Sequence, residues 1–287
     1  MVGSYPAVWL LVLLSGLGVT MFHPAAGKAA REVAGESTAA MSVFAAGGSV
    51  GFFLAPVLAT PVLVAWGVRS SVLFLPPALL TGYVLLRVGR RAGTDGRSAN
   101  SRTGEDRWLP FGLLTAVATV RSVVFFGVST FAGLYWLRDL GASRVVAGAA
   151  LACFLGGGLT GTLLGGRIAD RIGLTRTIQL GTALTVPALA GLVLAPGPYV
   201  PLLFAALTGA ALNIPFAVLV KLGQDYLPAR PGTAAGVTLG LALSIGGLFA
   251  PPLGLLAEAH GPYGVLVVLC AVPLLALAIG HFLPEPG

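Results

Sequence analysis

The sequence predicts an all-α polytopic membrane protein with nine transmembrane helices. Of its 287 residues, 56% are apolar and only 9% are charged, whereas about 25% of residues are charged in soluble domains. The mean hydropathy is +0.92, and the 41 glycines and 20 prolines fit transmembrane helices, in which both residues are common. A soluble protein of this length could not bury so much apolar surface, so we expect the helices to cross a bilayer.

Nine stretches are apolar over the length of about 20 residues that a helix needs to cross a membrane. In chain order they are 6–26, 38–62, 70–89, 109–137, 145–166, 176–195, 199–221, 233–257 and 262–283. Clusters such as Gly156-Gly157-Gly158 and Pro251-Pro252 lie inside them and permit close packing or bending of helices. The first stretch lacks the basic segment that begins a signal peptide, so we interpret it as a membrane span.

Basic residues gather on one side when successive loops are assigned to alternate sides of the membrane. That side receives Lys28, Arg31, Arg87, Arg90, Arg91, Arg97, Arg102, Arg107, Arg167, Arg171, Arg176, Lys221 and Arg230. The other side receives Arg69, Arg138 and Arg144. The positive-inside rule predicts that the first side is cytoplasmic, with the C-terminus on it, in a plasma or inner membrane. The net charge of +7 does not predict a nucleic-acid partner, because the basic residues lie in short loops rather than on one face.

A polar segment, 90–107, divides the chain into two unequal parts. We interpret it as a flexible cytoplasmic linker. It separates three predicted helices in 1–89 from six in 108–287.

An internal repeat accounts for this inequality. Ser15-Gly16 and Lys28 correspond to Thr208-Gly209 and Lys221 at a constant offset of 193 residues. Both copies run in the same direction, as in transporters built from two parallel six-helix repeats. Three helices precede the second copy, and projecting their start back by the offset falls about 85 residues before Met1. We therefore expect a segment of three helices upstream of this sequence, encoded with it or separately.

The loop between the fifth and sixth stretches has the most specific motif. It reads GGRIADRIGLTR over residues 165–176 and resembles the loop motif of the major facilitator superfamily. The residues that carry this resemblance are Gly166, Arg167, Asp170, Arg171, Gly173 and Arg176. We expect Gly166 to allow close helix contact, Gly173 to form a turn with positive φ, and Asp170 to receive a cation or cap a neighbouring helix. The resemblance implies a conformational-gating loop; the alternative is an ordinary basic loop.

A second resemblance extends in order along the whole chain. The segment GVTMFHP, residues 18–24, followed by Lys28 and Arg31, is similar to the fourth helix of the fosmidomycin-resistance group of efflux transporters. The segment 224–232 also has a counterpart there. The resemblance implies helices 4–12 of a twelve-helix transporter: residues 1–89 as the second half of the N-terminal bundle and 108–287 as the C-terminal bundle. One departure is Ala25, where members of the group often have Glu, and it puts a proton relay through that carboxylate in doubt.

The family resemblance implies a secondary active transporter, with proton-coupled efflux of a small drug-like or anionic compound. Its expected partners are therefore a small-molecule substrate, protons and the lipid bilayer. An uptake carrier or exchanger of the same fold and a non-transporting truncated remnant remain as alternatives.

Three polar residues within predicted spans are candidates for substrate binding or proton coupling, because polar groups in the bilayer are costly. Arg121 suits bidentate contacts with phosphonate or phosphate; its alternatives are a carboxylate partner in the upstream helices, or snorkelling to the interface. His23 has a reference pKa of about 6.5, but a structural hydrogen bond at a proline-bent helix end explains it equally well. Asn213 either lines the cavity or bonds backbone freed by Pro215.

The sequence has no Walker loop, dinucleotide fingerprint, Cys/His metal spacing or nucleophile elbow. We therefore expect no enzymatic activity, no cofactor and no metal site.

Overall fold

The computed structural model describes residues 5–94 and 104–286, and within these ranges the secondary structure is entirely helical. Its helices are α1 (Tyr5–Ala34), α2 (Thr38–Trp66), the 3₁₀ helix η1 (Val68–Phe74), α3 (Leu75–Thr94), α4 (Trp108–Arg138), α5 (Arg144–Ile172), α6 (Leu174–Leu194), α7 (Val200–Asn213), α8 (Phe216–Tyr226), α9 (Pro231–Gly236), the π-helix η2 (Val237–Leu241), α10 (Ala242–Leu248) and α11 (Ala250–Gly280). The predicted all-α fold class is confirmed.

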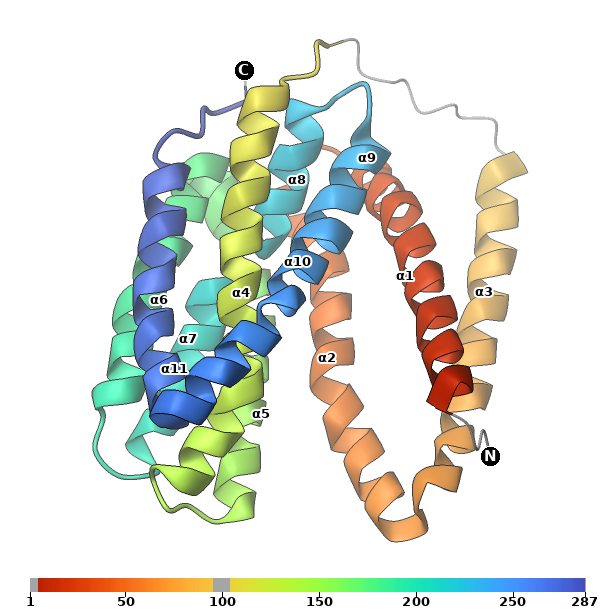
Figure 1. Ribbon diagram of the computed structural model, residues 1–287. Helices are drawn as coiled ribbons and strands as arrows, with labels where there is room; N and C mark the ends of the chain where they lie inside the picture. Colours follow the sequence, from red (N-terminus) through yellow and green to blue (C-terminus); the bar gives the residue numbers. More distant parts are fainter. Residues whose placement is uncertain (1–4, 95–103, 287) are drawn as a thin grey trace.

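Eight helical segments of the described chain are long and apolar enough to cross a membrane. The last of them, Pro231–Gly280, supplies both the eighth and the ninth predicted spans. It contains Gly261, whose φ of 70° breaks the helix, and the chain reverses there (Figure 1). A residue with a side chain is strained at such a φ, so a glycine permits this tight return.

Two boundaries differ from the sequence-based expectation. The predicted span 199–221 is divided into α7 and α8 at Pro215, because proline has no N–H for the helical ladder. The segment 90–107 is not a linker throughout, because α3 continues to Thr94. Residues 95–103, the rest of the predicted flexible segment, lie outside the described residues.

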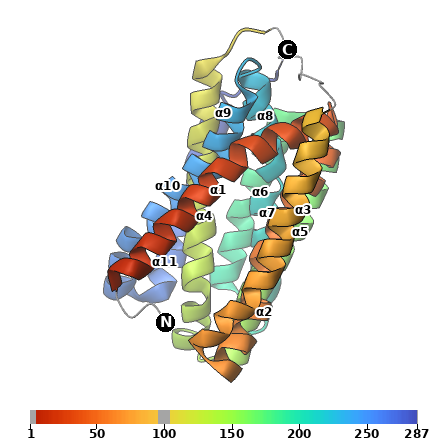
Figure 2. The ribbon, with the colours of Figure 1, turned by 90° about the vertical axis from the view of Figure 1, so that its right-hand side faces the viewer.

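The helices form two halves, α1–α3 and α4–α11, which converge at one end of the molecule and diverge at the other (Figure 1). We name the end where they converge the basic end, because Arg31, Arg107 and Arg230 gather there in contacts between helix ends. The halves meet where α2 packs on α5 and α8, and where α1 packs on α9. Viewed from the side of the first half, α1 runs obliquely across the molecule (Figure 2).

Glycines hold α5 and α7 in very close contact within the second half. They recur every fourth residue of α5, at Gly157, Gly161 and Gly165. A Cβ on Gly161 would lie 2.1 Å from the carbonyl oxygen of Ala210, far inside van der Waals contact. Small residues at this spacing let membrane helices approach closely, where packing replaces the hydrophobic effect as the source of association.

We therefore expect Gly161→Ala to lower the free energy of unfolding by about 1–3 kcal/mol, since the added methyl group overpacks the contact. Gly148→Ala, on the same helix with no atom within 4 Å of the new Cβ, is the matched control and should be as stable as the parent. Thermal unfolding of the purified protein in detergent measures both. Equal melting temperatures for the two variants would contradict the close contact.

Candidate functional site

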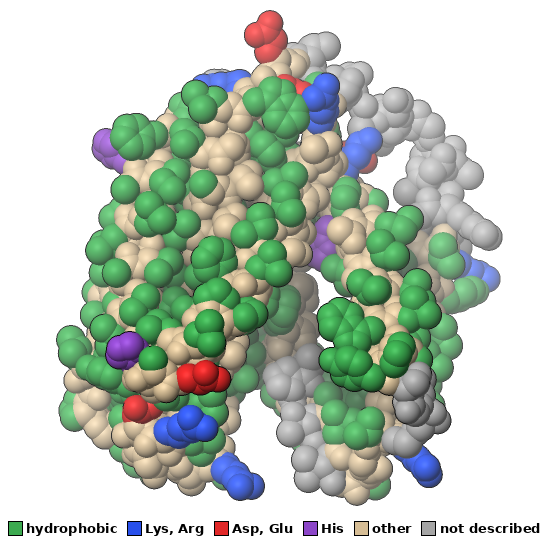
Figure 3. All heavy atoms as spheres, viewed as in Figure 1, with side chains coloured by type: hydrophobic (Ala, Val, Ile, Leu, Met, Phe, Trp, Pro, Cys, Tyr) green, Lys and Arg blue, Asp and Glu red, His purple; other side chains and the backbone are tan. Residues whose placement is uncertain are grey.

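A cavity of about 470 Å³ lies between the two halves. In the space-filling view a hollow separates the halves at the end opposite the basic end (Figure 3). The cavity is lined by Phe22, His23, Phe44, Ala45, Gly47, Gly48, Ser49, Phe52, Arg121, Phe125, Leu155, Gly158, Asn213, Phe216, Leu239 and Leu243. Its volume is in the range of small-molecule sites, about 300–1,000 Å³.

Arg121 reaches the cavity from α4 and is 7% exposed. Its Nη1 donates to the backbone oxygen of Leu212 at 3.2 Å and to Oδ1 of Asn213 at 3.3 Å. Its guanidinium carbon lies 4.8 Å from the centre of the Phe216 ring, within cation–π range. Arg121 lies at the end of the fourth turn of α4, roughly 20 Å along the helix from Trp108, so the charge lies deep in the bundle.

The charge of Arg121 has no acidic partner among the described residues. Its contacts are with neutral groups, and the described residues that line the cavity include no Asp or Glu. Only Nη1 has hydrogen-bond acceptors within that part of the chain. A buried guanidinium in this state costs several kcal/mol, so the site is suited to an anion that would bind Nε and Nη2.

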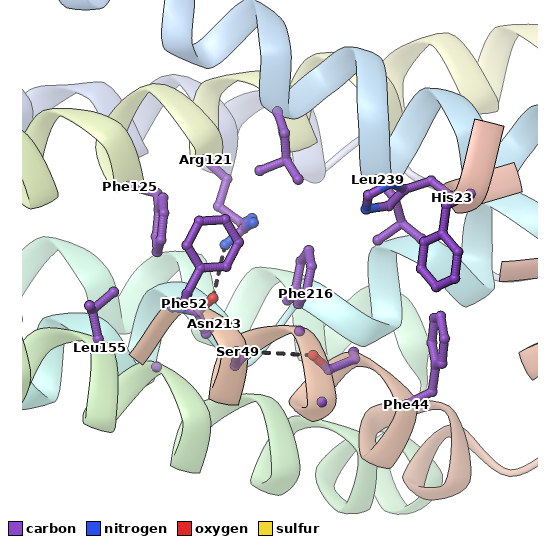
Figure 4. A pocket seen from close by; sticks show the side chains of 16 residues that line it. His23, Phe44, Ser49, Phe52, Arg121, Phe125, Leu155, Asn213, Phe216 and Leu239 are labelled. Carbon is purple, nitrogen blue, oxygen red and sulfur yellow. Dashed lines mark hydrogen bonds between the residues drawn. The ribbon is translucent and has the colours of Figure 1, made fainter. Parts of the chain in front are cut away.

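Asn213 orients this arginine. Its Nδ2 donates to the backbone oxygen of Gly209 at 2.9 Å, which turns its Oδ1 toward Arg121 (Figure 4). The carbonyl that Pro215 deprives of a partner is that of Ala211, four residues earlier, so Asn213 does not repair the proline break. It lines the cavity and holds Arg121 in place.

His23 lines the same cavity from α1, and Figure 4 shows it at the opposite end from Arg121. Its Nδ1 lies 2.8 Å from the backbone oxygen of Val19. That bond requires a proton on Nδ1, because a carbonyl oxygen only accepts. His23 therefore makes a structural hydrogen bond within α1 and also faces the cavity.

Asp170 joins the two halves at the basic end. It comes from α5, and its Oδ1 and Oδ2 accept from the backbone N–H groups of Thr38 and Ala39 at 2.7 and 3.0 Å. Its Oδ2 is also 3.3 Å from the hydroxyl of Ser37. Of the two expected roles, capping a neighbouring helix is the one observed: a carboxylate of one half meets the helix N-terminus of the other, where both the free N–H groups and the dipole favour negative charge.

The other motif residues support this contact to different degrees. A Cβ on Gly166 would lie 2.5 Å from Oγ of Ser42, so the missing side chain lets α2 approach α5. Gly173 has φ of 94° at the turn into α6. Arg167, Arg171 and Arg176 are exposed and have no ion pair within the described residues.

A charged cluster that the motif analysis did not find lies beside this contact. Arg31 of α1 and Asp225 of α8 are 2.5 Å apart (Nη2 to Oδ1), with 11% and 10% of their side chains exposed. Lys221 lies 3.1 Å from the other oxygen of Asp225. The pairing of Arg31 with Asp225 was not expected, because residues 194 positions apart show no local pattern in a single sequence.

Gln224 adds a neutral contact between the halves. Its Nε2 donates to the backbone oxygen of Gly27 at 2.9 Å. Gly27 permits this approach, since a Cβ there would lie 2.6 Å from that of Ala235.

The chain matches the family model described as Major Facilitator Superfamily over residues 1–251 and again over 114–287. The fosmidomycin resistance protein of Escherichia coli K12 is 29% identical over 99% of this chain and 72% of its own length. The uncharacterized MFS-type transporter YfnC of Bacillus subtilis 168 is also 29% identical, over 98% of this chain and 72% of its own length.

Among solved structures, the fold is similar to that of FucP, a major facilitator superfamily transporter in the outward conformation. The TM-score is 0.71 over 92% of this chain and 73% of FucP. The sequences are only 14% identical, so this likeness concerns the fold alone.

If Asp170 holds the halves together, Asp170→Ala should increase the population in which the basic end is separated. Losing a helix cap costs about 0.5–2 kcal/mol, which corresponds to roughly a 2- to 30-fold change in that population. Electron–electron double resonance between spin labels at positions 28 and 176, in a variant with both native cysteines replaced by serine, measures the distance distribution.

Asp139→Ala is the matched control, because Asp139 is an exposed carboxylate just beyond α4 at the other end of the bundle. It should leave the distribution unchanged. An unchanged distribution in Asp170→Ala as well would remove the cap from the conformational equilibrium.

Proposed function

Because the chain belongs to the major facilitator superfamily, a family of membrane transporters, we propose that it exports a small anionic or drug-like compound in exchange for protons. The observation that carries this proposal is the guanidinium of Arg121, which is buried beside a cavity between two helical halves and has no acidic partner among the described residues. Such a group is stabilised when an anion binds and is costly when the cavity is empty.

The basic end is the cytoplasmic end in this proposal, because short loops on the cytoplasmic side carry an excess of Lys and Arg. The C-terminus then lies in the cytoplasm. The contacts of Asp170 and Asp225 hold the halves together at that end, so the cavity faces the outside. Transport requires the halves to rock about the cavity until it faces the cytoplasm.

Export is favoured over uptake by the kinship with the Escherichia coli relative, whose name refers to resistance to fosmidomycin. A transporter confers resistance by removing a compound from the cell. Fosmidomycin is a phosphonate, and two N–H groups of the planar arginine guanidinium can bind two phosphonate oxygens at once. This combination supports an anion as the exported species.

Proton coupling needs a group that titrates in contact with the cavity. His23 is the candidate, since it lines the cavity and imidazole is the side chain that changes charge near neutral pH. It lies across the cavity from Arg121 (Figure 4), and protonation there would add a second positive charge to the same space. Ala25, two residues along α1, supplies no carboxylate for a relay.

Transport of radiolabelled fosmidomycin into inverted membrane vesicles tests the role of Arg121. We expect Arg121→Ala to lower transport kcat/KM by about 10- to 150-fold, the equivalent of a hydrogen bond to a charged group, about 1.5–3 kcal/mol. Arg121→Lys keeps the positive charge but not the paired N–H groups of the guanidinium, so its transport kcat/KM should be intermediate. Arg138→Ala is the control, because Arg138 is exposed at the end of the same helix, and it should transport normally. Normal transport by Arg121→Ala as well would exclude Arg121 from the site.

The same vesicles test direction and coupling. We expect a proton gradient, acidic inside the inverted vesicles, to drive accumulation, and a protonophore to abolish it. His23→Gln should lose the response to the gradient while retaining facilitated equilibration. Accumulation that continues after the gradient has been collapsed would rule out proton antiport, and accumulation only in right-side-out vesicles would indicate an uptake carrier.

A further inference from the structure

The cavity walls combine one fixed positive charge with an unusual concentration of aromatic rings. Of the 16 described residues that line it, five are phenylalanines, although the whole chain has 14. Apart from Arg121 and His23, its side chains are apolar or neutral. A small, highly hydrated anion would leave most of this wall facing water, and that wall is better covered by an apolar body.

The phenylalanines that line the cavity with Arg121 come from both halves of the molecule. Phe216 of α8 packs against the guanidinium at 4.8 Å. Phe125 is one turn beyond Arg121 on α4, on the same helix face, and Phe52 of α2 lines the same cavity. Phe52 and Phe125 are 6.0 Å apart in an edge-to-face pair, the arrangement that aromatic rings prefer.

From this geometry we infer that the preferred substrate is an organic anion with a single acidic group on a flat aromatic body. The acidic group binds Nε and Nη2 of Arg121, and the aromatic body packs against the edge-to-face pair of Phe52 and Phe125. Because these two rings belong to different halves, an aromatic body packed against the pair contacts both halves at once. This inference rests on the proposed function and narrows its substrate class.

The test is equilibrium binding to the purified protein in nanodiscs, with empty nanodiscs subtracted. The probe is 2-naphthoate, followed by its fluorescence anisotropy; 2-naphthamide is its neutral counterpart, and methylphosphonate is a small polar anion used as a competitor. We expect 2-naphthoate to bind at least tenfold more tightly than either comparison compound. Arg121→Gln should remove the preference for naphthoate over naphthamide.

Phe125→Leu should weaken 2-naphthoate about 3- to 10-fold, the range of one aromatic pair, and leave methylphosphonate competition unchanged. Phe52→Leu, at a more exposed position, should behave in the same way and serves if Phe125→Leu does not fold. Phe282→Leu is the control, because Phe282 is 71% exposed and does not line the cavity.

Equal binding of naphthoate and naphthamide, or an unchanged naphthoate affinity in both Phe variants, would overturn the inference. If methylphosphonate binds in an Arg121-dependent way and more tightly than naphthoate, the aromatic preference is wrong while anion export stands. If no anion binds, both proposals fall.

Discussion

Polar groups join the two halves at the basic end, beside a buried apolar cluster in which Met41 packs with Val220 and Ala235, and the shape of the cavity depends on this contact. A bilayer provides no hydrogen-bond partners, so polar groups near it must be satisfied within the protein. The carboxylate of Asp170 is satisfied by the first turn of α2, and the carboxylate of Asp225 by two basic side chains. With the halves joined there, they diverge toward the other end and leave a hollow between them (Figure 3).

Glycine makes these polar contacts possible. Gly166 of α5 and Gly27 of α1 both lie where a Cβ would collide with the opposite half. Each is close in sequence to a polar residue that spans the interface, Asp170 in one case and Arg31 in the other. A side chain at either glycine would move the helices apart. The donor–acceptor distances of these hydrogen bonds would then be too long for the bonds to form.

Much of the fold could be predicted from the sequence, because the spans are set by length and hydropathy alone. The break at Pro215 and the extension of α3 to Thr94 were missed, since hydropathy does not distinguish a bent helix from a straight one or mark where a helix ends beyond the membrane. Arg121 was identified because a charge in an apolar span is conspicuous. The phenylalanines around it were not, because an apolar residue facing a cavity and one facing lipid look identical in a single sequence.

The pairing of Arg31 with Asp225 could not be predicted for a related reason. Charged residues at helix ends are expected on both sides of any membrane protein, and only the tertiary arrangement brings α1 against α8. The role of Asp170 was more accessible, because the spacing of glycines and charges around it forms a local motif. What the motif did not specify was which helix it would cap.

The N-terminus of α2 is completed by two different parts of the chain. The hydroxyl of Ser37 accepts from the N–H of Ala40, while the N–H groups of Thr38 and Ala39 depend on Asp170 from the other half. When the halves separate, those two amides have only water as an acceptor, and the first turn of α2 is free to fray. Their hydrogen-exchange rates therefore record how often the two halves separate at the basic end.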